Sequence, residues 1–269
     1  MAATSANEIV VREAPRTRRA APIGRRGLLR LLIAVALVGG WEAGVHLGWI
    51  DPFFFSSPSA IAATLGKQVQ SGAIYKHLSA TLQEALWGLV LGALGGAALA
   101  WLATRSQVIS DLLDPLLLLL NSVPRIVLAP IFVMWLGIGM NSKIAVAFFL
   151  VFVVVFFAVA AGIREVDRTL VERIVVLGGS PRDLLLEVYL PSVLSWVFSS
   201  LRVAVGFAFT GAIVGEFVGA SSGLGYLMNF AQGSQNASLM MVTVVVIMAV
   251  IAVLFAILER VERRLMAWK

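Results

Sequence analysis

The chain has 269 residues, of which 59% are hydrophobic and only 13% are charged, and it contains no cysteine. A soluble domain carries about 25% charged residues because polar groups must cover its surface, so this composition argues against a soluble enzyme and indicates an integral membrane protein. The formal net charge of +6 would also fit a nucleic-acid partner, but the Lys and Arg residues lie in an N-terminal tail and beside apolar runs. That distribution is typical of membrane topology, so no nucleic acid is expected as a partner.

Residues 1–27 form the first segment of the chain. They include several Arg, Pro15 and Pro22 and few large apolar side chains, so they cannot bury enough surface to fold alone. We expect a disordered, basic cytoplasmic tail. A secretory signal peptide over residues 25–40 is the competing interpretation, but the apolar run continues into Trp41 without a small-residue cleavage site.

Six apolar segments follow, each of about 20 residues, the length that a helix needs to cross the hydrocarbon core. The clearest are residues 85–104, 144–163 and 239–258. Three others contain prolines or charged residues, and these are residues 28–48, 113–135 and 192–218. The sequence therefore predicts an all-α integral membrane fold with six transmembrane helices in one domain, residues 28–269, whose core covers residues 80–260.

The Lys and Arg residues predict the orientation of these helices. With both termini in the cytoplasm, sixteen of them lie in cytoplasmic segments and three, Lys67, Lys76 and Lys143, lie in outer loops. This bias follows the positive-inside rule, and two termini on one side agree with an even number of spans.

Small residues recur along the second span. Gly88, Gly92 and Gly96 stand four residues apart on one helical stripe, with Gly95 beside them. Small residues let helix backbones approach closely in lipid. The stripe is expected to pack within the chain or, as the alternative, against a second subunit.

The segment 113–135 contains candidates for a translocation pathway. Pro124 and Pro130 remove helical hydrogen bonds, and Asn121 and Ser122 stand beside them. Freed carbonyl groups are tolerated in a membrane only against protein or in a water-lined cavity, so these four residues are predicted to line the pathway. A simple packing kink explains the prolines nearly as well.

Charged residues inside the spans are the second group of pathway candidates, since such charges normally face a protein interior or a water path. Arg202 and Glu216 lie about 21 Å apart on one expected helix and cannot pair with each other. A partnered or interfacial charge is the competing interpretation for both. Glu84 is expected at a boundary or in a helix–helix contact. His77 stands isolated, and no metal site is predicted.

The longest cytoplasmic loop, residues 164–191, has clear helix signals. A helix is expected to end at Gly178 and Gly179, and Ser180 then caps a second short helix with Pro181 at its first position. The second helix has one apolar face, formed by Leu184, Leu185 and Val188. Two helices and a tight turn predict a docking element for a partner; an inert amphipathic loop on the membrane is the alternative.

The same loop resembles that of a known family. Glu172, Gly178, Leu190 and Pro191 stand at the spacing of the E-A-A-x3-G-x9-I-x-L-P loop of binding-protein-dependent ABC transporter permeases. The match departs at three positions: Arg173, Ile174 and Val188. Further segments resemble the nitrate/sulfonate/taurine branch, namely Ser57-Pro58-Ser59-Ala60, Trp135-x-Gly137-x-Gly139, and Glu216 followed by the run from Ala220 to Leu227.

The resemblance implies a type I importer permease in the bacterial cytoplasmic (inner) membrane. It implies a homodimer of permease chains, two cytoplasmic ABC ATPase subunits and an extracytoplasmic solute-binding protein. The residues that it implies for coupling to the ATPase are Glu172, Gly178, Gly179, Ser180, Pro181, Leu184, Leu185, Val188, Leu190 and Pro191.

The chain itself is not expected to be an enzyme. It has no G-x4-G-K-[ST] loop to cradle phosphates, so ATP and Mg²⁺ are expected on the partner subunits and no cofactor on this chain. The spans offer no nucleophile with a base and no metal cluster, so no catalytic residue is predicted. A gradient-driven carrier or channel without an ATPase is the alternative function. The solute stays open among sulfonates, taurine, nitrate and vitamin precursors, with a small anion favoured.

Overall fold

The structure is a computed structural model that describes residues 23–122 and 124–265. All regular structure in these two ranges is helical, as predicted. The chain divides into two units, Met1–Ile50 and Asp51–Lys269. The expected disordered tail lies outside the described residues up to residue 22, whereas its last five positions already belong to a helix that begins at Ile23.

The first unit contributes one helix, α1 (Ile23–His46). Its Leu and Val side chains are exposed on all sides, as in Leu31 (60%) and Leu37 (70%). A helix with apolar side chains all around and enough length to cross a membrane is typical of a lipid-facing span. Its one acidic residue, Glu42, lies 3.0 Å from the imidazole Nε2 of His46, one helical turn further on.

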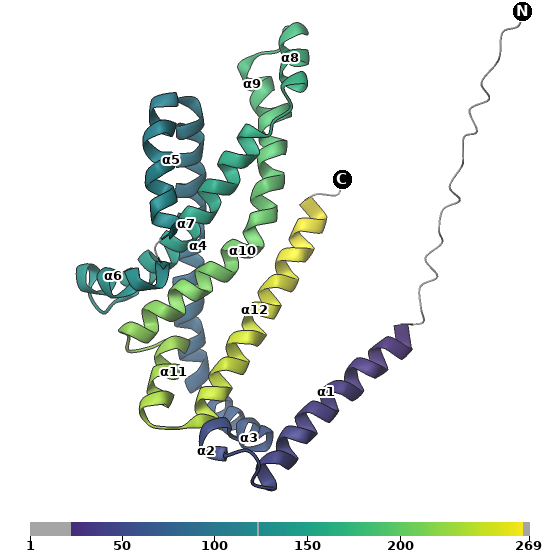
Figure 1. The fold of residues 1–269 in the computed structure, drawn as a ribbon, viewed down its shortest axis with the longest axis vertical. Helices are drawn as coiled ribbons and strands as arrows, with labels where there is room; N and C mark the ends of the chain where they lie inside the picture. The colour runs from purple at the N-terminus through teal and green to yellow at the C-terminus, as the bar shows by residue number, and fades with distance from the viewer. Residues whose placement is uncertain (1–22, 123, 266–269) are drawn as a thin grey trace, which may run out of the picture. The chain divides into compact units, whose positions relative to one another are not determined.

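The second unit contains the remaining elements (Figure 1). In chain order these are α2 (Pro52–Phe55), α3 (Pro58–Gln70), α4 (Ala73–Arg105), α5 (Gln107–Ser122), the 3₁₀ turn η1 (Arg125–Leu128), α6 (Ala129–Leu136), α7 (Met140–Arg164), α8 (Arg168–Val176), α9 (Pro181–Asp183), the π-helical turn η2 (Leu184–Tyr189), α10 (Leu190–Val218), α11 (Leu224–Gly233) and α12 (Ala237–Leu265).

Five helices in the described residues are long and apolar enough to cross a membrane, and they lie in α1, α4, α7, α10 and α12. The sixth expected span, residues 113–135, is not one continuous helix. The chain there forms α5, η1 and α6 instead, and Pro124 and Pro130 lie at this break. Proline cannot donate a backbone hydrogen bond and its ring clashes with the carbonyl four residues before it, which explains why one long helix does not form.

The core of the second unit is the contact between α4 and α7. A Cβ added to Gly88 would lie 2.3 Å from the Cβ of Ala147, one added to Gly92 would lie 2.7 Å from the carbonyl oxygen of Phe148, and one added to Gly96 would lie 2.5 Å from that of Phe152. Any larger residue would therefore force the helices apart. The glycine stripe packs within the chain, the first of the two arrangements expected for it.

Helix α10 completes this core. Ala204, Ala208 and Phe209 of α10 are buried with Val155 and Phe156 of α7. Because α10 packs on both α7 and α4, the three helices form one packed core.

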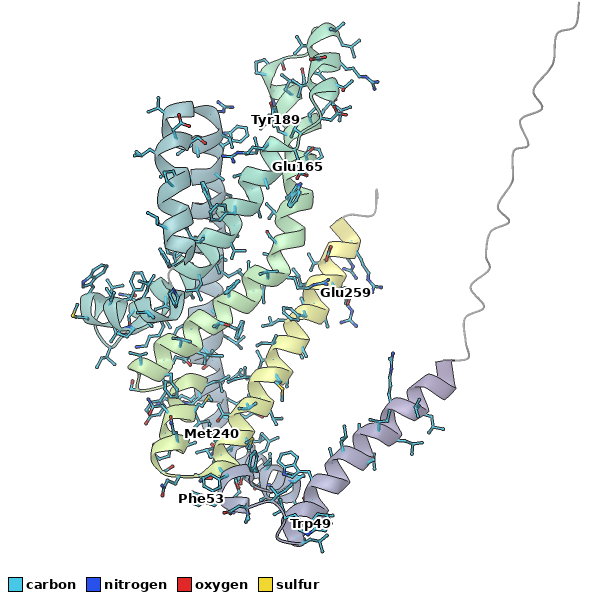
Figure 2. All side chains as sticks on the ribbon, in the orientation of Figure 1. Trp49, Phe53, Glu165, Tyr189, Met240 and Glu259 are labelled. Carbon is cyan, nitrogen blue, oxygen red and sulfur yellow. The ribbon has the colours of Figure 1, made fainter. Side chains whose placement is uncertain are left out.

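Two contacts show the direction of the helices. Arg164 at the end of α7 donates to Ser110 near the start of α5, 3.2 Å away, and Thr81 near the start of α4 donates to Glu216 near the end of α10, 2.6 Å away. Helices α4 and α7 therefore run in the same direction and α10 runs opposite to them. The unit has an α8–α9 end and, opposite to it, an end formed by α2, α3 and α11, here called the α3–α11 end (Figure 1). Figure 2 places Glu165 and Tyr189 toward the first and Phe53 and Met240 toward the second.

Candidate functional site

The candidate site is the segment between α7 and α10, residues 164–191. Asp167 caps α8 by accepting a hydrogen bond from the backbone N–H of Thr169 at 2.8 Å. At the other end, Gly178 has φ of +78°, and its N–H donates to the carbonyl of Val175 while the Gly179 N–H donates to that of Ile174. These two bonds form the Schellman arrangement that ends a helix at a left-handed glycine. The predicted end of the first helix is therefore in place.

The turn also requires glycine at position 179, but for lack of space and not for its backbone angle. A Cβ at this position would lie 2.4 Å from the Cγ2 of Ile174 and 2.9 Å from its carbonyl oxygen. Ile174 is one of the positions at which the loop departs from the family pattern. The tight turn thus depends on backbone freedom at Gly178 and on the missing side chain at Gly179.

Ser180 and Asp183 form a reciprocal capping box. The Asp183 N–H donates to the Ser180 hydroxyl oxygen at 3.3 Å, and the Ser180 N–H donates to the Asp183 carboxylate at 2.8 Å. The hydroxyl of Ser180 also donates to this carboxylate at 2.7 Å. The hydrogen bonds from Ser180 lower the pKa of Asp183, since they favour the ionised form. Pro181 occupies the first helical position, where a missing N–H costs nothing.

The second helix of the loop is not a separate element, which differs from our expectation. After α9 the backbone passes through the π turn η2 directly into α10, with the Leu190 N–H bonded to the carbonyl of Leu185, five residues back. Pro191 follows at once. A proline ring clashes with the carbonyl four residues before it, and the wider π turn relieves such a clash without breaking the helix. The loop is thus joined to α10 by continuous helical backbone.

The apolar side chains of this segment divide into two sets. Val188 is buried at 4% exposure and therefore packs inward, although the sequence placed it on one face with Leu184 and Leu185. Val176 and Leu177 are each 85% exposed, and Leu185 and Leu186 are 36% and 47% exposed. These four exposed apolar side chains, at the end of α8 and in η2, form a surface that needs a partner or lipid to cover it. We call these four residues the loop tip.

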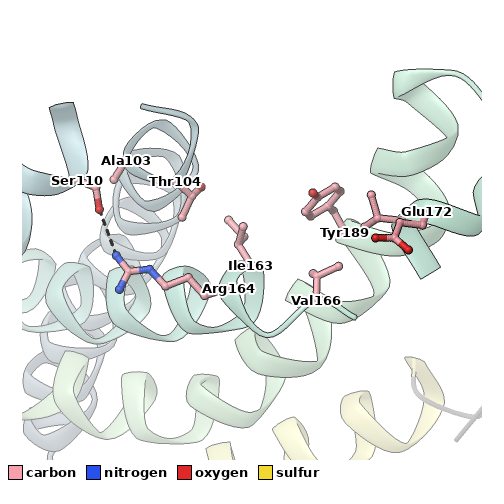
Figure 3. Close-up of a pocket in the computed structure, with 9 residues that line it drawn as sticks. Ala103, Thr104, Ser110, Ile163, Arg164, Val166, Glu172 and Tyr189 are labelled. Atoms are coloured by element: carbon pink, nitrogen blue, oxygen red, sulfur yellow. Dashed lines mark hydrogen bonds between the residues drawn. The ribbon is translucent and has the colours of Figure 1, made fainter. Parts of the chain in front are cut away.

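A pocket of about 690 Å³ is lined by residues of α4, α5, α7, α8 and η2 (Figure 3). Glu172 and Arg164 contribute charge to its wall, and Arg164 is held by Ser110. Tyr189 stands at the pocket with its ring edge-on to Trp101 of α4, the ring centroids being 6.4 Å apart. The guanidinium of Arg105 lies 4.5 Å above the same indole. The Tyr189–Trp101 contact connects the loop to α4, and it could not be predicted from the sequence because the two residues are far apart in the chain.

The predicted pathway residues do not come together in one place. Asn121 and Ser122 end α5, and their side chains lie outside the described part of the structure. Pro124 and Pro130 are exposed at the break between α5 and α6. Arg202 pairs with Glu262 of α12 at 3.5 Å, so the competing interpretation of a partnered charge describes it well.

Glu216 is 1% exposed at the α3–α11 end, inside the protein. Its oxygens accept hydrogen bonds from the Thr81 hydroxyl at 2.6 Å and from the Gly225 N–H at 2.7 Å. Glu84 and Lys143 are buried beside it. Lys143 was expected in an outer loop, but it lies within α7 at 2% exposure. Sequence alone could flag these charges but could not show that three helices bring them together.

No group of three or more His, Cys, Asp or Glu among the described residues is arranged to hold a metal ion. The loop residues Glu172, Gly178, Leu190 and Pro191 stand at the spacing found in one class of membrane protein. Residues 78–267 match the family of binding-protein-dependent transport system inner membrane components. The chain belongs to this family.

Relatives of this permease cover nearly its whole length. A probable ABC transporter permease from Haemophilus influenzae is 35% identical over 83% of this chain and 91% of its own. The riboflavin transport permease RibX of Chloroflexus aurantiacus is 30% identical over 85% of both chains, and the taurine transport permease TauC of Escherichia coli is 27% identical over 92% of both. The permease is thus a transport subunit and not an enzyme, and it is a multi-pass protein of the inner membrane.

Solved structures support the fold. The MetNI methionine ABC transporter, in an inward facing conformation, has a chain that aligns with a TM-score of 0.57 at 19% identity, covering 71% of this permease and 93% of that chain. At that identity the likeness concerns the arrangement of helices alone.

Proposed function

We propose that this permease forms the membrane pathway of an ATP-driven importer and that the loop tip is the surface on which the ATPase docks. The main support for this proposal is the continuous helical backbone that connects the loop to α10. Four apolar side chains are exposed on a segment that is capped at both turns and continuous with α10. A helical segment of this kind transmits a displacement of the docked ATPase to α10, whereas a flexible loop would not.

The direction of the helices supports six spans with both termini in the cytoplasm. Because α4 and α7 run in the same direction, the chain between them must return across the membrane, and α5, η1 and α6 are the segment that does so. The 16 residues of α5 span about 24 Å. This return segment adds one crossing to the five long helices, α1 included, and makes six. The α8–α9 end then faces the cytoplasm, where its Arg residues satisfy the positive-inside rule.

The proposal includes the partners and the energy source. Two copies of this permease form one pathway, two cytoplasmic ATPase subunits bind ATP and Mg²⁺, and an extracytoplasmic binding protein delivers the solute to the α3–α11 end. A small anion of the sulfonate or nitrate type is the proposed solute, in keeping with a relative named for taurine. Selectivity would reside largely in the binding protein.

The docking assignment is tested with the assembled complex in liposomes. Val176→Asp together with Leu177→Asp should release the ATPase from the membrane and abolish solute-stimulated ATP hydrolysis, because two charges replace the apolar contact. Val69→Asp on α3 is the matched control, since Val69 is also exposed (42%) but lies at the other end. Full ATPase retention by the double variant would contradict the assignment.

The alternative function is tested in the same system. Liposomes that contain only this permease should show no uptake of the solute with or without an ion gradient. Gradient-dependent uptake by the permease alone would establish a carrier or channel instead. Loss of ATPase binding in the double variant would then show only that the loop tip is needed for assembly.

A further inference from the structure

Three ionisable side chains are buried together at the α3–α11 end. Glu84 of α4, Lys143 of α7 and Glu216 of α10 are 5%, 2% and 1% exposed. Lys143 lies close enough to act electrostatically on both carboxyl groups, and the two carboxyl groups are themselves in contact. The cluster thus contains two acids and one base whose side chains are almost fully buried. Burying an unbalanced charge costs several kcal/mol, so the stability of the cluster depends on how many protons its three side chains hold.

Glu216 has the hydrogen-bond donors that stabilise an ionised acid. Its Oε1 accepts a hydrogen bond from the Thr81 hydroxyl, and its Oε2 accepts one from the Gly225 N–H. Both oxygens therefore act as acceptors, which is the behaviour of a carboxylate. The backbone of Gly223 also approaches this carboxyl group so closely that a Cβ there would lie 2.1 Å from Oε1. The site is built tightly around Glu216.

Glu84 differs from Glu216 in its partners. Its Oε2 is buried and has no hydrogen-bond partner among the described residues. With Lys143 balancing Glu216, an ionised Glu84 would leave one uncompensated negative charge and an unsatisfied oxygen in the protein interior. A protonated Glu84 removes the charge and supplies a donor to the carboxylate of Glu216.

We propose that Glu84 binds a proton and that Glu84, Lys143 and Glu216 form an electrically neutral latch. The latch holds the segment between α10 and α11 against α4. Thr81 transmits the contact, since it donates to Glu216 and accepts a hydrogen bond from the Leu224 N–H at 2.8 Å. The proton is thus a bound component of the α3–α11 end, and its loss would put two carboxylates against one ammonium group and weaken the latch.

The other titratable groups nearby do not supply the missing charge. His77, two helical turns before Glu84 on α4, accepts a hydrogen bond at Nδ1 from the Gly223 N–H at 3.1 Å, so this nitrogen carries no proton and the ring is neutral. Tyr226 of α11 stacks on His77 with ring centroids 5.7 Å apart. Lys76, the residue directly before His77, is exposed. Lys143 is the only cation among the described residues that is buried with the two acids.

The latch also shapes a second pocket. A hollow of about 510 Å³ between α10 and α11 is lined by Glu216, Tyr226, Asn229 and Phe230 among others. Since Glu216 fixes the start of α11 through Gly225, deprotonation of Glu84 would change the geometry of this pocket. The proton therefore controls the shape of the surface that α11 presents at this end.

The test compares two isosteric variants. Glu84→Gln imitates the protonated acid and should keep the melting temperature of the detergent-solubilised protein close to that of the unmodified chain. Glu216→Gln removes the carboxylate that Lys143 and three donors surround, and should lower it by about 5 °C or more. The reverse order, with Glu84→Gln the damaging change, would overturn the assignment of the proton to Glu84.

Infrared spectroscopy supplies a direct measurement that does not depend on transport. The unmodified chain at neutral pH should show the carbonyl stretching band of a buried, protonated carboxylic acid, and Glu84→Gln should lose that band. If Glu84→Gln fails to fold, the band is followed in the unmodified chain with ¹³C-labelled glutamate. Absence of a glutamic acid band at neutral pH would overturn the proposal, whatever the variants do.

Discussion

The ring of Tyr189 stands at 87° to the indole of Trp101, with the centroids 6.4 Å apart. Tyr189 ends the π turn of the loop and Trp101 lies near the end of α4, so this edge-on pair joins the loop of residues 164–191 to the helix that packs most closely on α7. Such pairs stabilise by about 0.5–1.5 kcal/mol beyond the area they bury. The contact is a second connection between the loop and the membrane helices, besides the continuous backbone into α10.

Separating this pair should uncouple the loop from α4. We expect Tyr189→Leu and Trp101→Leu each to reduce transport while the ATPase stays bound, because the loop tip is untouched. In a double-mutant cycle of unfolding free energies, the coupling between the two positions should be about 1 kcal/mol. Additive effects of the two substitutions would show that the rings do not interact.

The turn at Gly179 should not tolerate a side chain. Gly179→Ala places a methyl group against Ile174 and should cost about 1–3 kcal/mol of local stability, measured as faster amide hydrogen exchange in α8 and α9. Gly206→Ala in α10 is the matched control, since a Cβ there meets no atom within 4 Å. Equal exchange rates in the two variants would mean that the turn relaxes without strain.

The capping box should make the start of α9 sensitive to acid. The pKa of Asp183 is lowered by the hydrogen bonds from Ser180, so the stabilisation is fully present above the unfolded-state value of about 3.9 and is lost as the pH falls through the lower folded-state value. Hydrogen exchange at the first residues of α9, corrected for its intrinsic pH dependence, should therefore accelerate below about pH 4. Asp183→Asn should abolish this dependence, and Ser180→Ala should cost about 1 kcal/mol at neutral pH. A pH profile unchanged by Asp183→Asn would contradict the assignment.

The glycine stripe should be essential for folding of the membrane core. Gly92→Leu would drive a side chain into the backbone and side chain of α7, where a Cβ alone would lie 2.7 Å from the Phe148 carbonyl oxygen, and should prevent a stable, monodisperse protein in detergent. Gly66→Leu in α3 has open space and serves as the control. A monodisperse Gly92→Leu variant would show that α4 and α7 can move apart.

Arg202 should contribute little to transport. It forms an ion pair with Glu262 that is half exposed on the Arg side, and such pairs are worth about 0–1 kcal/mol. Arg202→Gln should therefore leave uptake rates and melting temperature nearly unchanged. A large loss of uptake with normal stability would restore Arg202 as a pathway residue.

The sequence by itself determined the class of the protein, the helical signals of the loop and its family. These depend on local properties: apolar runs of membrane length, glycines at a turn, and Ser180 followed by Pro181 and Asp183. Each acts through residues a few positions apart, so the printed order of residues carries the information. The helix cap at Ser180 and the helix end at Gly178 accordingly lie where the sequence placed them.

Only the tertiary structure decided which long-range contacts form. Val188 shares a sequence pattern with Leu185 yet is buried, because it lies in the π turn η2, where the wider helix moves residues three apart onto different faces. Lys143 was expected in a loop from the sequence yet is buried, because Glu84 and Glu216 from two other helices lie beside it there. Partners of this kind are far apart in the chain, and burial of a charge depends on the sum of all charges around it. The apolar runs in the sequence thus determine where the membrane helices form, whereas tertiary packing determines which of the few charged residues are buried in the protein.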